Sequence, residues 1–438
     1  MKNGARTLLL LFGDILLLGA AFAIMLYIYV SSHNGSFKNT ALPHIFPFSI
    51  LGLIWIVIFF VFNLYDREVS RLTIPHLRQI FTAFITALMV GIIFFYTIPF
   101  FQIAPKTNLL IFGGIAFIFF IAWRRIFYNI FSSHFRKKVV FIVGGRNNQP
   151  QVNDLVQYIT AHPQSGFIVS GIYDLLKQFK ESSRGDISRV FIVSKETWRD
   201  SENFKRLYDT KNEVLDLAYA YEDIMGRIPI EAIDEGWFMH NVRSHKKKIY
   251  DFEKRVLSII IAALILVITS PFFAIIALLV KFNDGGPVLY SQTRVGKNGK
   301  NFRLYKFRSM KVDAEKNGPE WSTKEDLRIT PVGRILRKLH IDELPQMFNI
   351  FKGDIDLVGP RPERPEFVLQ LEKEIPFYHL RHIITPGFTG WAQIKFRYAG
   401  SVIDSKDKFE YDLYYLKNRN TFMDLGILLR TLQIIFTH

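Results

Sequence analysis

Four long apolar segments within residues 1–130 constrain the fold of this chain more than any other feature. They are Leu8–Tyr29, Phe46–Phe62, Ile80–Phe100 and Thr107–Trp123. Each is close to, or somewhat below, the ~20 residues that a helix needs to cross a bilayer. The composition agrees, because 49% of the residues are hydrophobic and the chain contains 42 Phe. We therefore predict a membrane protein in which residues 1–130 form a four-helix transmembrane bundle.

Basic residues predict how this bundle is oriented. They precede the first segment and follow the second and the fourth, whereas the two other loops hold one lysine each. They are Lys2, Arg6, Arg67, Arg71, Arg78, Arg124, Arg125, Arg136, Lys137 and Lys138. Because cytoplasmic loops carry the excess of Lys and Arg, both ends of the bundle are expected in the cytoplasm. Asp14, inside the first segment, is either a functional acid or a packing contact, and we favour the packing contact.

The formal net charge of +16 indicates an anionic partner. An anionic membrane surface together with an anionic substrate fits the apolar segments better than nucleic acid does, so no nucleic-acid partner is expected. The absence of cysteine excludes disulfides, thiolate metal sites and cysteine nucleophiles.

Residues 137–240 have the pattern of a Rossmann-like α/β domain. Four apolar stretches separated by helical patterns predict the strands of a parallel sheet; they read VVFIVGG, GFIVSGIYD, RVFIVS and LDLAYA. Gly144 and Gly145 allow a tight turn after the first strand. The third glycine of a dinucleotide fingerprint is absent, so we favour a structural or oligomerisation role over nucleotide binding.

A fifth apolar segment, residues 254–281, has basic residues on both flanks and Pro271 near its centre. Proline lacks an N–H and clashes with the preceding turn, and Ser270 can bond a carbonyl that is freed there. We predict a helix-break-helix at Ser270-Pro271 that re-enters the cytoplasmic face, with a Pro-kinked spanning helix as the alternative.

Residues Leu339–Pro362 combine the charged groups of a possible active site. Asp342 and Glu343 directly precede Pro345 and a short apolar helix, and a rigid Pro360-Arg361-Pro362 corner follows. Proline favours a helix start, where free N–H groups attract anions. Carboxylates beside cations at such a place suit a phosphate and a divalent ion, although solvated caps are the commoner reading of such a pair.

Further candidate groups lie on either side of this segment. Two short strands are predicted around a Gly-Lys-Asn-Gly turn, and Lys306 and Arg308 follow with one residue between them. Alternation in an extended chain places both on one side, for phosphate or for lipid headgroups. Arg294 is a weaker candidate of the same kind, and Arg337 lies in the helical stretch before the acidic pair. The Gly-rich stretch PGFTGWAQ ends in Gln393.

Several of these motifs occur together in one family. The stretch IDELPQMFNIFKGD with VGPRP, the KFRSM before it and the PGFTGWAQ after it resemble the signature of bacterial polyprenol-phosphate phosphoglycosyl transferases, which start exopolysaccharide or O-antigen assembly. The resemblance covers residues 250–438 and implies an α+β catalytic domain on a re-entrant hairpin. His340 departs from the usual pattern at a position that we expect to be peripheral.

The resemblance also implies a reaction and its residues. Asp342 would attack the sugar-bearing phosphate of a UDP-sugar, release UMP and pass the sugar phosphate to undecaprenyl phosphate. Glu343 would help to bind Mg²⁺, or Mn²⁺ in its place. Lys306, Arg308, Arg337 and Arg361 would contact phosphates, and Gln393 would lie near the nucleotide.

The expected setting is the bacterial inner membrane, with several spans and the catalytic domain on the cytoplasmic face. The sugar is left open among hexoses, with a preference for glucose over galactose, and a homodimer is possible. The alternative is a catalytically inactive membrane scaffold or regulator whose α/β domain senses a nucleotide. A transporter fits less well, because paired intramembrane charges and inverted repeats are not evident.

Overall fold

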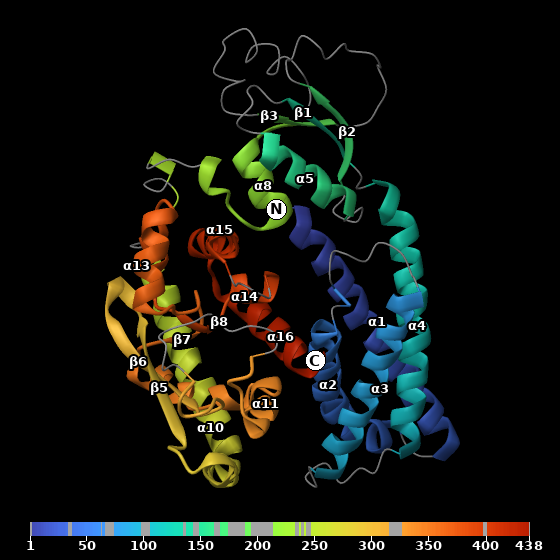
Figure 1. The fold of residues 1–438 in the computed structure, drawn as a ribbon. Helices are drawn as coiled ribbons and strands as arrows, with labels where there is room; N and C mark the ends of the chain where they lie inside the picture. Colours follow the sequence, from blue (N-terminus) through green and yellow to red (C-terminus); the bar gives the residue numbers. More distant parts are fainter. Residues whose placement is uncertain are drawn as a thin grey trace. The chain divides into compact units, whose positions relative to one another are not determined.

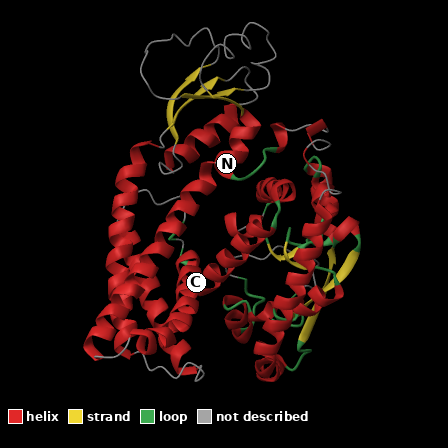
Figure 2. Ribbon diagram, turned by 180° about the vertical axis from the view of Figure 1, so that it is seen from behind, coloured by secondary structure: helices red, strands yellow, loops and turns green. Residues whose placement is uncertain are grey.

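The structure is a computed structural model (Figures 1 and 2). It describes residues 2–33, 37–62, 64–65, 74–97, 106–134, 137–142, 149–161, 167–173, 189–193, 213–232, 236–237, 241, 247–314, 326–396 and 401–437. The chain divides into two compact units, Met1–Asp216 and Leu217–His438.

The four predicted apolar segments are long helices that lie side by side in Figure 1. They are α1 (Lys2–His33), α2 (Phe37–Val61), α3 (Ile74–Thr97) and α4 (Lys106–His134). Each is long and apolar enough to cross a membrane. Trp55, Phe59 and Phe112 are buried in the core between them, whereas other large apolar side chains, such as Leu53 and Ile118, point outward. This inside-and-outside apolarity is typical of a bundle whose outer face contacts lipid.

Asp14 forms a buried ion pair, which fits the packing contact that we favoured. Its carboxylate accepts a hydrogen bond of 2.9 Å from Arg124 on α4, and both side chains are fully buried. The Arg124 guanidinium also lies over the ring of Phe120, at 4.4 Å from its centroid. The pair therefore fixes α1 against α4.

The α/β part of the first unit has a four-stranded parallel sheet, as predicted. Its strands are β1 (Lys137–Ile142), β2 (Phe167–Tyr173), β3 (Arg189–Val193) and β4 (Glu213–Asp216), in the order β2-β1-β3-β4, and α5 (Gln149–Ala161) follows β1. The turn with Gly144 and Gly145 lies outside the described residues.

The fourth predicted strand is only partly correct. β4 ends at Asp216, and the rest of LDLAYA begins helix α8 (Leu217–Met225). Leu217, Ala220 and Tyr221 are buried at the spacing of one helix face, which explains why this apolar run is helical. We had extended the α/β domain to residue 240, whereas α8 belongs to the second unit. Directly after α8, the Gly226 carbonyl accepts a hydrogen bond of 2.7 Å from the Trp391 indole.

The second unit is built around helix α10 and several short elements. They are η5 (Ile230–Ala232), α10 (Lys248–Asp284), β5 (Leu289–Val295), η7 (Lys297–Gly299), β6 (Asn301–Phe307), α11 (Pro331–Lys338), η8 (Ile341–Glu343), α12 (Gln346–Lys352), β7 (Asp356–Val358), α13 (Pro365–Glu374), η9 (Tyr378–Ile383), β8 (Gly387–Thr389), α14 (Trp391–Lys395), α15 (Val402–Asn418) and α16 (Thr421–Thr437). The two strands predicted around the Gly-Lys-Asn-Gly turn form a β-hairpin, because β5 and β6 pair antiparallel. Strand β7 pairs parallel with β8. Met347, Ile350 and Phe409 lie in the buried core.

Helix α10 runs from Lys248 to Asp284 as one helix with Pro271 inside it, so the structure records no interruption where we predicted a helix-break-helix. A bend of the helix at Pro271 stays a prediction. Proline cannot donate the N–H that would bond the Val267 carbonyl. The Ser270 hydroxyl donates to that carbonyl instead, at 3.0 Å, as the sequence suggested. The lost bond is thereby replaced, and the helix continues through the proline. A re-entrant path in the membrane stays a prediction.

Candidate active site

The acidic pair lies in a short turn between two helices. α11 begins at Pro331 after Thr330, whose hydroxyl accepts the Gly333 N–H. His340 then adopts the left-handed conformation, with a φ of 56°, and starts the 3-10 turn of Ile341–Glu343. Pro345 directly precedes α12, as predicted. A non-glycine residue with positive φ is uncommon and costs free energy, so the surrounding structure holds this reversal in place.

Glu343 is held by two cations from distant parts of the chain. Its Oε1 accepts hydrogen bonds from Lys306 Nζ at 2.6 Å and from an Arg361 Nη at 2.7 Å. Burial opposes ionisation, yet the charges of Arg361 and Lys306 hold the pKa of Glu343 well below its usual range. Glu343 is therefore a carboxylate at any physiological pH.

Asp342 has the opposite surroundings. It is buried, and the described residues give its carboxylate no hydrogen bond. Burial, followed by the negative charge of Glu343, raises the pKa of Asp342, while Lys306 and the nearby arginines limit the rise. A desolvated carboxylate without donors is more nucleophilic than a solvated one, so Asp342 is suited to attack and Glu343 is suited to hold charge in place.

Two of the predicted phosphate contacts have other partners in the structure. Arg308 forms an ion pair with Asp284 at the end of α10, and the Arg337 Nε donates to the Ser309 hydroxyl at 2.8 Å. Neither contacts the acidic pair within the described residues. The Arg308 Nη1 has no partner there either and remains available as a donor. A phosphate contact by these two arginines stays a prediction.

The Pro360-Arg361-Pro362 corner is supported from three sides. The Arg381 guanidinium donates to the Arg361 carbonyl at 3.0 Å and is paired with Asp412 at 2.8 Å. Arg294 donates to the Pro362 carbonyl at 3.1 Å and so supports the corner, while its predicted phosphate contact is not tested by this bond. The Gly387 N–H donates to the Pro360 carbonyl at 2.9 Å. The corner thus presents Arg361 from a fixed backbone.

The Gly-rich stretch PGFTGWAQ, which contains β8, packs closely against the backbone at this corner. A Cβ on Gly387 would lie 2.0 Å from the Gly359 nitrogen, and one on Gly390 would lie 2.2 Å from the Gly359 oxygen. Only glycine allows β8 to approach so near. The Gln393 amide donates to the Phe388 carbonyl at 3.3 Å, while its Oε1 has no partner within the described residues. The predicted contact of Gln393 with a nucleotide is not tested by these bonds.

Sequence reasoning missed Asn349, which joins α12 to β6. Its amide oxygen accepts the Tyr305 N–H at 3.0 Å, and its amide nitrogen donates to the Arg303 carbonyl at 2.6 Å. The side chain is fully buried. These bonds fix the helix after the acidic pair against the strand that carries Lys306. An amide inside the apolar run MFNIF was the signal that could have identified it.

The oxygen donors of the acidic pair suit Mg²⁺, which usually binds one or two carboxylates, water and substrate phosphates. No group of three or more His, Asp or Glu side chains arranged for a metal occurs among the described residues. Glu343 Oε1 is already bonded to two cations, which leaves its second oxygen and Asp342. The pair therefore fits a metal ion that the substrate helps to bind better than a closed protein site.

Comparisons with known proteins agree with this geometry. A family model described as bacterial sugar transferase matches residues 249–438, and one described as CoA-binding domain matches residues 61–189. A UDP-glucose:undecaprenyl-phosphate glucose-1-phosphate transferase of Klebsiella pneumoniae is 32% identical over 330 residues, which are 70% of this chain and 68% of the relative.

Two further relatives match shorter parts of this chain. A UDP-N-acetylgalactosamine-undecaprenyl-phosphate N-acetylgalactosaminephosphotransferase of Aeromonas hydrophila is 43% identical over 216 residues, which are 49% of this chain and 50% of the relative. A UDP-glucose:undecaprenyl-phosphate glucose-1-phosphate transferase of Escherichia coli K12 is 41% identical over 180 residues, which are 41% of this chain and 39% of the relative. The chain thus spans about half the length of the Aeromonas protein.

Replacing Asn349 should loosen the site without touching a charged group. Asn349→Ala leaves the Tyr305 N–H and the Arg303 carbonyl, whose bonds to Asn349 are part-buried, without these partners, which costs roughly 1–3 kcal/mol. We expect a lower midpoint of thermal unfolding for the solubilised full chain. Asn301→Ala, an exposed asparagine on the same strand, is the matched control and should change stability by less than about 0.5 kcal/mol. Equal midpoints for the two variants would contradict the role given to Asn349.

Neutralising the two acids should change stability in opposite directions at pH 7. The raised pKa of Asp342 means that folding disfavours its charged form as pH rises, so Asp342→Asn should raise the unfolding midpoint. Glu343→Gln leaves two cations unpaired and should lower it, by roughly 1–3 kcal/mol because Arg361 is partly exposed.

The pH dependence provides the check on this account. Glu343 has a depressed pKa, so its contribution is present above the unfolded pKa and is lost as pH falls toward the folded one. The destabilisation by Glu343→Gln should therefore shrink in acid. The gain from Asp342→Asn should vanish below the unfolded pKa of an aspartate. Shifts of the same sign at pH 7 would refute the assignment.

Proposed function

This chain belongs to the bacterial sugar transferases of the polyprenol-phosphate phosphoglycosyl transferase family, and from that premise we propose its reaction. It transfers a hexose 1-phosphate from a UDP-sugar to undecaprenyl phosphate and releases UMP, as a first membrane step of polysaccharide assembly. The observation that carries this proposal is the asymmetry of the acidic pair. Glu343 is ionised and held by Lys306 and Arg361, whereas Asp342 is buried beside it without a hydrogen bond among the described residues.

The proposed transfer has two steps through a covalent phosphosugar–aspartyl intermediate. An oxygen of Asp342 forms a bond to the sugar-bearing phosphorus, and the bond from that phosphorus to the bridging oxygen breaks, so that UMP leaves with the electron pair. An oxygen of undecaprenyl phosphate then attacks the same phosphorus. The bond to Asp342 breaks, and the carboxylate is restored.

Charge neutralisation is the main demand of this chemistry, because two anions must approach each other. Lys306 and Arg361 already face the acidic pair, and Arg337 lies close enough to lower the pKa of Asp342. Bound Mg²⁺, or Mn²⁺, would supply further neutralisation of the phosphates, with Glu343 as its protein ligand. Lys306 and Arg361 also keep Glu343 ionised, so that its carboxylate stays free of a proton and able to bind a metal ion.

The sugar is a hexose whose identity the assay must decide. The relatives include one named for N-acetylgalactosamine and two named for glucose, and the former has the highest identity of the three. The preference for glucose that we drew from the sequence is therefore weighed against N-acetylgalactosamine, and both belong in the panel.

The proposed location is the bacterial inner membrane, with the second unit on the cytoplasmic face. α10 is apolar enough to cross a membrane, and its first turns and Lys281 near its end are basic. The positive-inside rule favours both ends on one side, and we infer from it a re-entrant helix that bends at Ser270-Pro271. UDP-sugars are found in the cytoplasm, so a re-entrant path of α10 keeps the acidic pair on the side of the membrane that holds the proposed substrate.

The reaction is tested by release of UMP from the purified, solubilised full chain with Mg²⁺, undecaprenyl phosphate and a panel of UDP-sugars. We expect release with one sugar, a loss of at least about 1,000-fold in Asp342→Asn, and loss of the first step even without acceptor. Asn301→Ala, which changes an exposed side chain, is the control for preparation. Release by Asp342→Asn at the wild-type rate would exclude the covalent route. Silence across the panel from a folded protein would favour a scaffold or regulator instead.

The membrane path is tested by labelling single cysteines, which the natural chain lacks entirely. Asn153→Cys on α5 precedes α10, and Lys300→Cys follows it; both side chains are exposed. A membrane-impermeant maleimide should label both only in inside-out vesicles if α10 is re-entrant. Asn34→Cys, in the loop between the first two apolar segments, should label in intact cells. Labelling of positions 153 and 300 from opposite sides would establish a crossing.

A further inference from the structure

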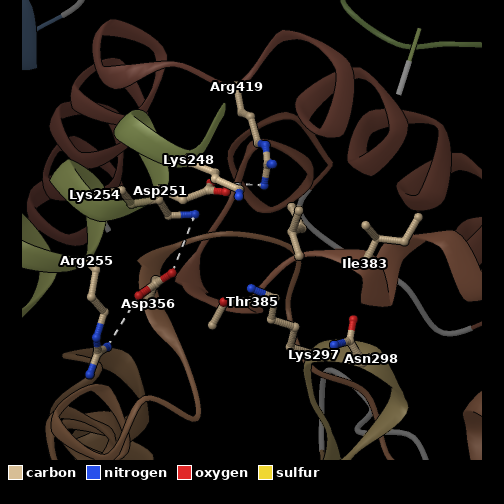
Figure 3. A pocket seen from close by; sticks show the side chains of 11 residues that line it. Lys248, Asp251, Lys254, Arg255, Lys297, Asn298, Asp356, Ile383, Thr385 and Arg419 are labelled. Carbon is tan, nitrogen blue, oxygen red and sulfur yellow. Dashed lines mark hydrogen bonds and ion pairs between the residues drawn. The ribbon is translucent and has the colours of Figure 1, made fainter. Parts of the chain in front are cut away.

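The first turns of α10 form one wall of a cavity of about 470 Å³ in the second unit (Figure 3). The turn η7 at the tip of the β5–β6 hairpin and residues 383–385 at the end of η9 form other walls. Arg419, between α15 and α16, also lines it. Five cations border the cavity: Lys248, Lys254, Arg255, Lys297 and Arg419.

Among the described residues, two carboxylates, Asp251 and Asp356, border the same cavity. Asp356 lies 3.8 Å from Lys254 and 3.4 Å from Arg255, as the dashed lines in Figure 3 mark. Asp251 lies 3.5 Å from Arg419. The acids therefore offset two of the positive charges and leave an excess of three. A partly enclosed space with this excess attracts an anion.

Arg419 is the observation that points to a bound group. Its side chain is 96% buried, yet its Nε has no hydrogen-bond partner within the described residues. A buried donor on a charged group is costly to leave unpaired. Guanidinium groups bind phosphate oxygens through several parallel N–H bonds. Lys248 and Lys297 are exposed at the cavity rim, and the structure records no ion pair for either among the described residues.

The cavity is separate from the acidic pair. Lys297 lies at the tip of the hairpin, whereas Lys306, which contacts Glu343, lies near the other end of β6. A strand of this length spans roughly 20 Å. The anion of this cavity is therefore not the phosphate that reacts at Asp342.

The position of the cavity along α10 identifies the source of the anion. Directly after Arg255 the helix becomes apolar, and Ile260, Leu264 and Val267 are exposed. In a chain with long apolar helices these side chains face lipid, so the basic start of α10 lies at the membrane surface. Basic clusters beside a membrane helix attract anionic lipid headgroups.

We propose that this cavity binds the phosphate headgroup of an anionic membrane phospholipid and so holds the start of α10 at the membrane surface. Arg419 supplies the buried donor, and Lys248 and Lys297 close over the phosphate from the rim. The site is independent of the proposed transfer reaction, because none of its residues contacts Asp342 or Glu343 within the described part of the chain.

The test is thermal unfolding of the full chain in a maltoside detergent, titrated with dioctanoyl phosphatidylglycerol. A ligand that binds only the folded protein raises the unfolding midpoint in a saturable way. We expect this rise with phosphatidylglycerol and not with dioctanoyl phosphatidylcholine. The double variant Lys248→Gln/Lys297→Gln should bind at least about tenfold more weakly, because two rim cations are lost. Both positions are exposed, so the variant should fold.

Lys300→Gln is the matched control, since it removes an exposed lysine from the same hairpin outside the cavity, and it should bind like the wild type. Asp342→Asn should also keep lipid binding, which separates this result from the transfer assay. Wild-type affinity in the double variant, or equal binding of phosphatidylcholine, would overturn the proposal. Stabilisation by inorganic phosphate at the concentrations where phosphatidylglycerol has no effect would assign the cavity to a free anion and overturn the lipid source.

Discussion

One carboxylate oxygen organises the second unit. Glu343 Oε1 bonds to Lys306 on β6 and to Arg361 in the proline corner, so three segments that are distant in sequence meet at one atom. Each cation is itself carried by a supported backbone. Asn349 fixes the strand of Lys306, and Arg381 fixes the carbonyl of Arg361. Burying two cations beside one carboxylate is costly unless their hydrogen-bond geometry is maintained. The packing around these three segments therefore holds Lys306 and Arg361 in place against Glu343.

The same contact separates the chemistry of two adjacent acids. A charged neighbour that is firmly paired still repels a second carboxylate, so Glu343 raises the pKa of Asp342 while its own is depressed. The left-handed His340 contributes by turning the chain sharply before the pair. It is exposed, as we expected of a peripheral position, yet its backbone conformation lies directly upstream of the site. Its importance is thus in the backbone rather than in the imidazole.

Local patterns predicted much of this structure, and long-range contacts account for the rest. Apolar length predicted the four helices, and Pro345 predicted the start of α12, because both depend on neighbouring residues. The partners of Arg308 and Arg337 depend on where α10 ends and how Ser309 packs, which no local rule contains. At Pro271 the Ser270 bond was anticipated, and it replaces the backbone bond that proline removes, so the helical assignment continues where a proline rule alone predicts an interruption.

Helix α10 contacts both the basic cavity and the surroundings of the acidic pair along its length. Its start lines the basic cavity, and its end holds Arg308 through Asp284. Between them, Phe273 packs against Phe307 with ring centroids 5.3 Å apart, and Ile276 and Val280 lie in the cluster that includes Leu336. Ile341 and Leu344, on either side of the acidic pair, pack against that cluster. A close-packed apolar contact transmits position with little slack. On the proposed membrane path, the depth of α10 would set the height of Asp342 above the membrane, so that a lipid phosphate could reach the proposed nucleophile at the membrane surface.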